Sequence, residues 1–149
     1  MNSTPIIDVI IPAFNEEKSI AKVIGDIPKL VRYVVVANNN STDRTAEVAM
    51  EGGAQVVFEP QKGYGKACLT AMNWIKRQEV QPDILIFLDG DYSDYPEELE
   101  GLIAPILADE ADLVIGSRSL GEREAGSMTF PQVFGNGLAT NLMLWMYGA

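Results

Sequence analysis

Residues 84–91 read ILIFLDGD, an apolar run that ends in two aspartates separated by a glycine. The run from Ile84 to Leu88 is too hydrophobic to have a solvent-facing side, which predicts a strand buried on both faces of a sheet. Asp89 and Asp91 then fall at the carboxyl end of that strand, where parallel sheets bind ligands. Carboxylate oxygens suit Mg²⁺ or Mn²⁺, which complete their coordination with waters and substrate phosphates. The motif alone fits two acidic turn residues equally well, so the rest of the chain has to decide.

The composition limits the classes of protein to consider. A chain of 149 residues with 47% hydrophobic content predicts one globular domain over residues 1–149. A net charge of −10 without a basic stripe argues against a nucleic-acid partner. The absence of histidine excludes Ser-His-Asp and Cys-His chemistry, and the single cysteine, Cys68, excludes a disulfide framework and favours a reducing compartment. Without a basic leader or an apolar stretch of ~18 residues, we expect a cytoplasmic protein.

Strand and helix patterns alternate along the chain. Strands are predicted over residues 6–13, 31–37, 55–59, 84–88 and 111–116. Helices are predicted over 16–27, from a cap at Ser41 or Thr42 to the glycines at 52 and 53, and over 66–78, 97–107 and 132–147. Such alternation predicts an α/β fold with a parallel sheet covered by helices on both faces.

Polar residues follow the predicted strands. Residues 14–16 follow the first strand, 38–40 the second, Asp89 and Asp91 the fourth, and Arg118 the fifth. If the strand order is 3-2-1-4, as in doubly wound sheets, the carboxyl ends of the first and fourth strands flank one crevice. We therefore expect residues 12–16, Asn39 and the acidic pair to lie together there.

Five motifs carry a resemblance to a known family. They are VIIPAFNEE at 9–17, NNNSTDRT at 38–45, GYGKA at 63–67, DGD at 89–91 and GSR at 116–118. In this order they resemble the family 2 glycosyltransferases of the GT-A (Rossmann-like) fold, in particular the dolichyl-phosphate mannose/glucose synthase-like branch. The resemblance implies a metal-dependent hexosyltransferase that moves a sugar, with inversion, from a nucleotide diphosphate sugar to an acceptor.

The resemblance also implies roles for individual residues. The nucleotide-sugar is expected to contact Pro12, Ala13, Phe14, Glu16, Ala37, Asn39, Lys66, Asp89, Gly90 and Asp91. Mg²⁺ or Mn²⁺ would be held by Asp89 and Asp91, and the catalytic group would comprise Asp91, Asp94 and Arg118. This agrees with the chemistry, because a diphosphate leaving group gains negative charge that a bound cation and a guanidinium can stabilise.

Two departures from the family pattern bear on the donor and on turnover. The usual second turn is Asp-Asp-Gly-Ser, whereas residues 38–41 read NNNS. An amide at Asn39 offers one donor and one acceptor, which matches the imide edge of uracil and favours a UDP-sugar over a GDP-sugar, with a simple turn residue as the alternative for Asn39. Family members also continue past this point with further acceptor-side residues. We therefore expect a truncated domain that binds the donor and whose turnover is in question.

The acceptor and the base stay open. A saccharide hydroxyl would need a general base, for which Asp94 is the nearest spare carboxylate, with Glu122 and Glu124 on the next loop. A polyprenyl-phosphate acceptor would need none and would place the protein at the cytoplasmic face of a membrane. The alternatives are a non-catalytic nucleotide-sugar-binding module and a haloacid-dehalogenase-like phosphatase, whose Asp-x-Asp lies on the first strand instead of the fourth.

Overall fold

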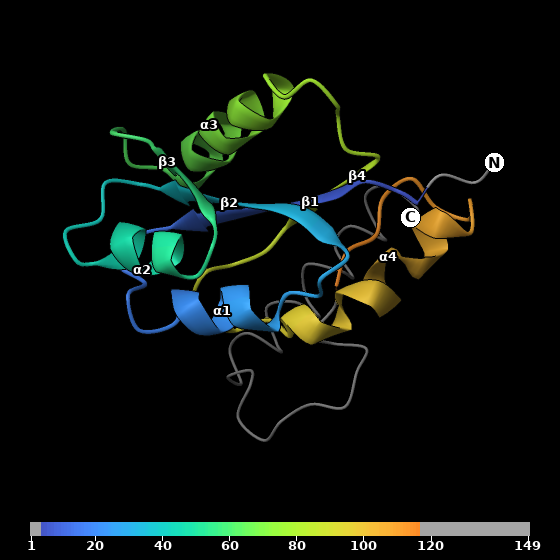
Figure 1. Ribbon diagram of the computed structural model, residues 1–149, viewed down its shortest axis with the longest axis horizontal. Helices are drawn as coiled ribbons and strands as arrows, with labels where there is room; N and C mark the ends of the chain where they lie inside the picture. The colour runs from blue at the N-terminus through green and yellow to red at the C-terminus, as the bar shows by residue number, and fades with distance from the viewer. Residues whose placement is uncertain (1–3, 117–149) are drawn as a thin grey trace, which may run out of the picture. The chain divides into compact units, whose positions relative to one another are not determined.

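The structure is a computed structural model that describes residues 4–116. Contacts divide the chain into two compact units, Met1–Val114 and Ile115–Ala149, and all the elements below lie in the first. In chain order they are β1 (Ile7–Ala13), α1 (Ile20–Asp26), β2 (Val31–Asn38), α2 (Thr45–Glu51), β3 (Gln55–Phe58), α3 (Tyr64–Lys76), β4 (Ile84–Phe87), a 3₁₀ turn (Pro96–Glu98) and α4 (Leu99–Leu107) (Figure 1). The prediction of one domain over residues 1–149 stays a prediction.

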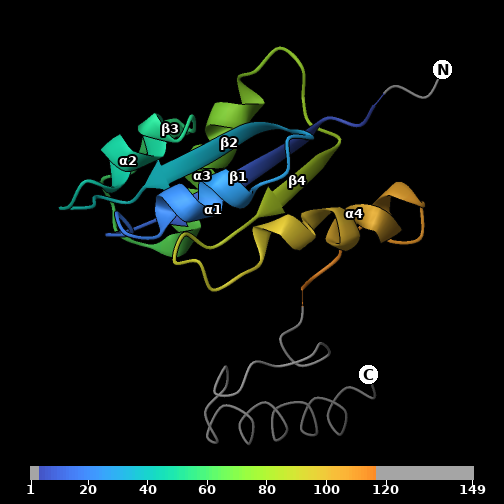
Figure 2. The same cartoon turned by 60° about the horizontal axis from the view of Figure 1, so that its bottom comes forward.

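The four described strands form one parallel sheet. Their order is β3-β2-β1-β4, which confirms the predicted order. Ile10 of β1 lies opposite Val35 of β2 on one side and Phe87 of β4 on the other. Figure 2 shows β4 alongside β1. Parallel neighbours require long crossovers, which the helices supply, so the carboxyl ends of all four strands lie at one edge of the sheet.

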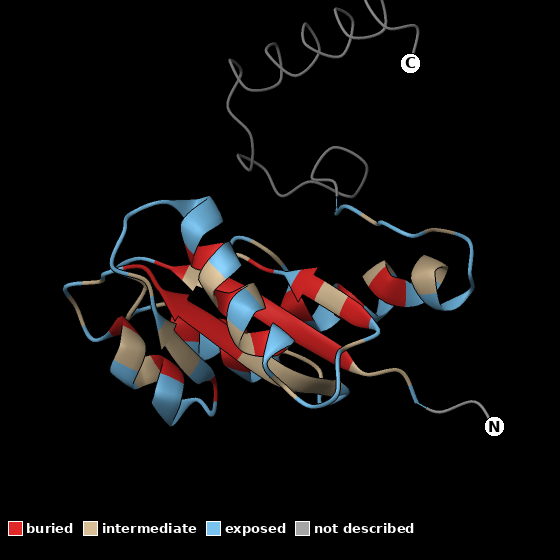
Figure 3. Cartoon of the chain, turned by 90° about the horizontal axis from the view of Figure 1, so that it is seen from above, coloured by how far each residue is buried: buried red, intermediate tan, exposed pale blue. Residues whose placement is uncertain are grey.

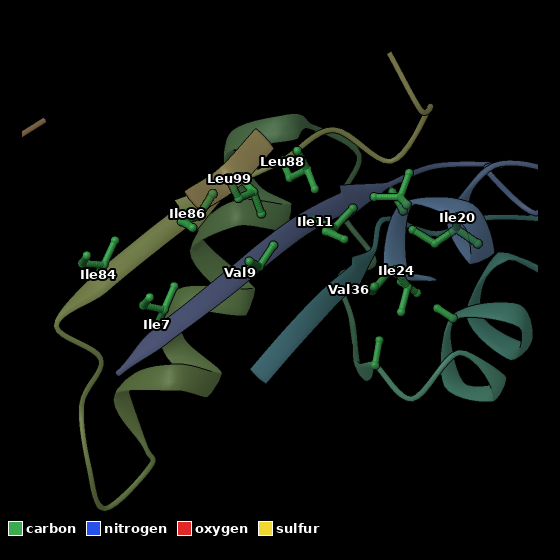
Figure 4. Packing of buried hydrophobic residues seen from close by; sticks show 14 of the residues in the cluster. Ile7, Val9, Ile11, Ile20, Ile24, Val36, Ile84, Ile86, Leu88 and Leu99 are labelled. Carbon is green, nitrogen blue, oxygen red and sulfur yellow. The ribbon is translucent and has the colours of Figure 1, made fainter. Parts of the chain in front are cut away.

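Helices cover both faces of the sheet, as predicted. In Figure 1, α3 lies above the sheet while α1, α2 and α4 lie below it. Because successive side chains of a strand point to opposite faces, Val9 and Ile11 pack against Ile20 of α1 and Leu99 of α4 (Figure 4). Ile10, between them in sequence, belongs to a second cluster under α3.

The core is made mainly by the sheet and by the helix sides that face it (Figure 3). Six of the seven residues of β1 are buried. Small residues on α3, Ala67 and Ala71, are fully buried and let that helix approach the strands closely. Each buried Ile or Val side chain contributes about 1.5–3 kcal/mol, so the hydrophobic run in β1 anchors both layers.

Two helices begin later than predicted, for the same reason. α1 starts at Ile20 and α2 at Thr45, about three or four residues after the predicted starts. Residues 16–19 form a turn in which the carbonyl of Glu16 accepts from the N–H groups of Ser19 and Ile20. The polar residues expected to cap each helix instead bond across to the other loop, which the sequence pattern alone does not reveal.

The predicted fifth strand is wrong over residues 111–116. This segment is not a strand, and Leu113 is 75% exposed. Its apolar residues resemble a buried strand, but a strand requires a hydrogen-bonded neighbour, and the described sheet provides none for it. The predicted loop at 117–129 and helix at 132–147 lie outside the described residues. No helix within residues 4–116 has the length and apolar character needed to cross a membrane.

Candidate functional site

The acidic motif packs directly against the end of β1. Gly90 is buried, and a Cβ atom built on it would lie 3.4 Å from Cγ2 of Ile11, 3.5 Å from Cγ of Glu16 and 3.6 Å from Cβ of Ala13. Only a residue with little or no side chain allows this approach. The structure therefore brings Asp89 and Asp91 to the edge where β1 ends, which confirms that the carboxyl ends of the first and fourth strands meet.

The two carboxylates are held by different neighbours. Oδ1 of Asp89 accepts from the Tyr64 hydroxyl at 3.3 Å, and the Asp89 N–H donates to Oδ2 of Asp94 at 3.4 Å. Oδ1 of Asp91 accepts from the N–H of Ser93 at 2.9 Å, across a reversal in which Tyr92 has a φ of 63°. Such a left-handed conformation is unusual for a bulky residue and turns the chain sharply after the motif. Asp91 is exposed and Asp89 half-buried.

The donor set of the acidic motif fits a hard divalent cation only in part. Both carboxylates keep oxygen lone pairs beyond the bonds they accept within the chain. No group of three or more His, Cys, Asp or Glu residues is placed to hold a metal within residues 4–116. Mg²⁺ and Mn²⁺ are commonly bound by one or two carboxylates together with waters and substrate phosphates. The motif therefore fits an ion that a diphosphate helps to hold, and does not fit an all-protein cage.

On the other side of β1, the ends of β1 and β2 are in register. Pro12 lies opposite Ala37, and Ala13 opposite Asn38. Ala37 is fully buried under α3, so its side chain is not accessible to a ligand. Phe14, in contrast, is 43% exposed, and Nζ of Lys62 lies 4.5 Å from the centre of its ring. A cation at this distance from an aromatic face is attracted to it, which brings the loop before α3 over the end of β1.

The loops after β1 and β2 are bonded to each other. The Glu16 N–H donates to Oγ1 of Thr45 at 2.8 Å, and the Thr42 N–H donates to Oδ1 of Asn15 at 2.8 Å. Burial acts to raise the pKa of Asp43, but hydrogen bonds from Thr45 and from backbone N–H groups outweigh it and hold that pKa below its ordinary value. The sequence pattern predicts a turn and a helix cap over this stretch and gives no sign that its side chains bond the two loops together.

Asn39 follows β2 directly and is already hydrogen-bonded within the chain. Its N–H donates to the carbonyl of Ala13 at 2.8 Å. Its side-chain Nδ2 donates to the carbonyls of Glu59 at 3.1 Å and Gln61 at 2.7 Å, and its Oδ1 accepts from the Gly63 N–H at 2.8 Å. Both amide hydrogens are therefore used within the chain, which leaves one acceptor lone pair on Oδ1.

The first turn of α3 contributes one expected and one unexpected residue. Lys66 is exposed, and its ammonium donates to the side-chain carbonyl of Gln61. Tyr64, which the sequence analysis did not select, presents its hydroxyl to Asp89 although the side chain is 59% exposed. Partial burial and the charge of Asp89 raise the pKa of Tyr64 to about 12, so this hydroxyl stays protonated and donates across the neutral range.

The remaining predicted residues divide into two groups. Glu16 lies beside Gly90, and its carboxylate accepts from the Ser19 hydroxyl at 2.9 Å. Asp94 folds back toward the end of β4, where it accepts from the Asp89 N–H. Arg118, Glu122 and Glu124 lie outside the described residues. The structure thus assembles the predicted residues of the first, second and fourth strand ends, and their roles remain predictions.

A parallel sheet in this order, with an acidic motif packed against the end of β1, defines a GT-A domain of the Rossmann-like α/β class. Residues 8–147 match the sequence profile described as "Glycosyl transferase family 2", and the chain belongs to that family. The comparisons with individual proteins agree with both statements.

Three similar proteins are informative. The "Low-salt glycan biosynthesis hexosyltransferase Agl6" of Haloferax volcanii is 36% identical over 97% of this chain and 35% of its own. The "UDP-N-acetylglucosamine--dolichyl-phosphate N-acetylglucosaminyltransferase" of Methanococcus voltae is 27% identical over 88% of this chain and 59% of its own. Among solved structures, glucosyl-3-phosphoglycerate synthase from Mycobacterium tuberculosis, in complex with Mn²⁺, UDP-glucose and phosphoglyceric acid, superposes with a TM-score of 0.61 at 30% identity, over 71% of this chain and 40% of that one. The chain thus spans between about a third and three fifths of these proteins.

Proposed function

We propose that this domain binds a UDP-sugar at the carboxyl ends of β1, β2 and β4 and transfers the hexose, with inversion, to an acceptor. The observation that carries the proposal is the packing of Gly90 against Ala13 and Glu16, which joins the acidic motif to the loop after β1. In the proposal, the nucleoside lies along Pro12, Ala13, Phe14, Glu16 and Asn39, and the diphosphate lies toward Lys66, Asp89, Gly90 and Asp91. Ala37 is left out because its side chain is fully buried under α3. A UDP-sugar is favoured over a GDP-sugar because two of the similar proteins are named with uridine nucleotides.

The acidic motif would hold Mg²⁺ or Mn²⁺ through Asp89 and Asp91. When bound, such an ion supplies Lewis-acid stabilisation of the diphosphate that leaves. Tyr64 donates to one oxygen of Asp89 and so orients the carboxylate, while the reversal at Tyr92 holds Asp91 at the open side of the motif. Arg118, by its place after the motif GS, is proposed to contact the same diphosphate as a bidentate donor.

The acceptor decides whether a base is needed. A polyprenyl phosphate, the class named for the M. voltae protein, already carries a nucleophilic anionic oxygen near neutral pH. With that acceptor we propose no general base, and the protein would work at the cytoplasmic face of a membrane. With a saccharide hydroxyl, Asp94 is the proposed base, because it lies beside the backbone of Asp89.

Thermal unfolding with UDP and Mn²⁺ tests the donor site. We expect the melting temperature of the 149-residue chain to rise with UDP and Mn²⁺ together, since a ligand at about 100 times its Kd stabilises by about 2.7 kcal/mol. Asp91→Asn should abolish the rise. Asp109→Asn, the same change at an exposed left-handed residue that Asn tolerates, should keep it. A chain that shows no metal-dependent shift with UDP would contradict the proposed donor site.

Turnover is tested separately from binding. Incubation with UDP-glucose or UDP-N-acetylglucosamine, Mn²⁺ and a short polyprenyl phosphate should release UDP and form the glycosylated lipid phosphate. If the lipid phosphate gives no glycosylated product while a saccharide acceptor does, the acceptor is a hydroxyl and Asp94 becomes the expected base. Binding without any release of UDP would instead support a non-catalytic nucleotide-sugar-binding module.

A further inference from the structure

The hydrogen bonds around Asn39 define a link between the end of β2 and the segment before α3. Nδ2 donates to two backbone carbonyls, those of Glu59 and Gln61, and Oδ1 accepts from the Gly63 N–H. This pattern fixes which end of the amide is oxygen and which is nitrogen. In the reverse orientation the amide oxygen would face the two carbonyl oxygens, and neither side could donate a hydrogen bond. Asn39 is only 7% exposed, and its three bonds to the segment are partly buried.

Gly63 is shaped for the same link. It adopts φ 144° and ψ 128°, a region that side-chain-bearing residues rarely enter, immediately before α3 begins at Tyr64. That conformation directs its N–H to Asn39 at 2.8 Å. A glycine at 63 and an amide at 39 therefore depend on one another.

The linked segment, residues 59–63, lies between the two halves of the proposed donor site. On one side Lys62 lies over the ring of Phe14. On the other side the segment leads into Tyr64, whose hydroxyl bonds Asp89. Glu59 secures the start of the segment, because its carboxylate accepts from the Thr70 hydroxyl at 2.5 Å. A displacement of residues 59–63 would therefore alter both the contact of Lys62 with Phe14 and the hydrogen bond of Tyr64 to Asp89.

We infer that Asn39 is a positioning residue, which acts on donor binding by holding residues 59–63 and not by reading the base. The part of this inference that concerns nucleotide affinity rests on the proposed function, whereas the part that concerns the hydrogen bonds to residues 59–63 does not. A carboxylate in this position cannot donate to the carbonyls of Glu59 and Gln61, and would face them with negative charge at a buried site. Asn39→Asp, which introduces the family's usual residue at this turn, should therefore loosen the segment in this chain.

Two measurements on Asn39→Asp test the inference. Amide hydrogen exchange at Gly63 should accelerate by about tenfold or more, because repulsion from the carbonyls of Glu59 and Gln61 moves the new carboxylate away from the Gly63 N–H. The affinities for UDP and for GDP, each with Mn²⁺ and measured by calorimetry, should fall by similar factors, about tenfold, and leave their ratio unchanged. Asn40→Asp adds the same charge one residue along at an exposed left-handed position, and should change either quantity by less than about twofold.

The opposite outcomes would overturn the inference. If Asn39→Asp leaves Gly63 exchange unchanged, or shifts the ratio of UDP to GDP affinity by more than about tenfold, Asn39 does not act through the segment. If that variant does not fold, Asn39→Ser removes the three bonds without adding charge and should give the same acceleration at Gly63. If the parent chain binds neither nucleotide, the proposed function fails, and the exchange measurement by itself still decides the link.

Discussion

The ion pair between Asp8 and Arg32 allows one prediction to be worked out from the structure. Asp8 lies near the start of β1 with its side chain fully buried, and Arg32 lies at the start of β2 with 25% of its side chain exposed. The guanidinium binds both carboxylate oxygens, Nε to Oδ1 at 3.0 Å and Nη2 to Oδ2 at 2.6 Å. The Tyr33 N–H adds a third bond to Oδ1 at 3.2 Å. Asp8 therefore depends on Arg32 for most of its compensation.

Arg32→Met should leave the carboxylate of Asp8 buried with one backbone hydrogen bond. Removing one partner of a buried pair costs about 3–5 kcal/mol, and water that enters where the guanidinium was partly exposed favours the lower end, about 3 kcal/mol. With an unfolding entropy of about 2.1 cal/mol/K per residue over about 110 residues, a loss of about 3 kcal/mol lowers the melting temperature by about 13 °C. Urea unfolding followed by circular dichroism gives the free energy of unfolding directly.

Two further variants make the measurement decisive. Arg44→Met breaks an exposed pair in which the Arg44 and Glu47 side chains are 64% and 62% exposed, and it should leave the free energy of unfolding nearly unchanged because solvent screens such a pair. Asp8→Asn added to Arg32→Met removes the uncompensated charge while its amide oxygen still accepts from Tyr33, so stability should recover by about half. A loss below about 1 kcal/mol for Arg32→Met, or no recovery in the double variant, would refute the reasoning.

Three more predictions concern the crevice. Gly90→Ala should change the free energy of unfolding by less than about 1 kcal/mol, because a Cβ meets its neighbours at ordinary distances, whereas Gly90→Leu should cost at least about 2 kcal/mol in urea unfolding. Tyr64→Phe should weaken Mn²⁺-dependent UDP binding in calorimetry by about threefold to tenfold without lowering the melting temperature, because only the donor to Asp89 is lost. Since the folded pKa of Asp43 is lowered, its contribution to stability is present above pH 3.8 and is lost as pH falls through the folded value; Asp43→Asn should remove that part of the acid-side decline in unfolding scans between about pH 2 and 5.

The sheet could be predicted from the sequence because its signal is local. Continuous apolar runs such as residues 84–88 identify strands, and polar residues after them identify the carboxyl ends. The prediction that this strand is buried on both faces is wrong at Phe87, which is 47% exposed, because β4 has a neighbour on one side alone in the described sheet. The strand order has no local signal; it is assumed from doubly wound sheets, and the structure confirms it. The segment 111–116 has the same local signal yet is not a strand, because the pattern reports apolar character and does not supply the hydrogen-bonded neighbour that a strand needs.

The loops could not be predicted in the same way because their bonds join distant residues. Thr45 bonds the Glu16 N–H across 29 residues, and Asn39 bonds the Gly63 N–H across 24. From composition alone, Thr45 is a helix residue and Asn39 a turn residue with a free amide. Polar side chains that cap the nearest helix in most proteins here bond backbone groups far away in the sequence. The helix starts and the hydrogen bonds of Asn39 can therefore be known only once the fold is known.

The polar groups of this domain separate into two classes that should respond differently to mutation. Within residues 4–116, no buried side-chain nitrogen or oxygen lacks a hydrogen-bond partner. Buried groups such as Asp8 and Asn39 are therefore committed to the chain, and their loss has to appear first in the free energy of unfolding or in local opening. Asp91 is exposed and keeps oxygen lone pairs beyond its bond to Ser93, so it has capacity for a ligand and little part in the core. Arg32→Met should thus lower stability while the folded chain keeps its affinity for UDP and Mn²⁺. Asp91→Asn should instead remove that affinity and leave the free energy of unfolding nearly unchanged.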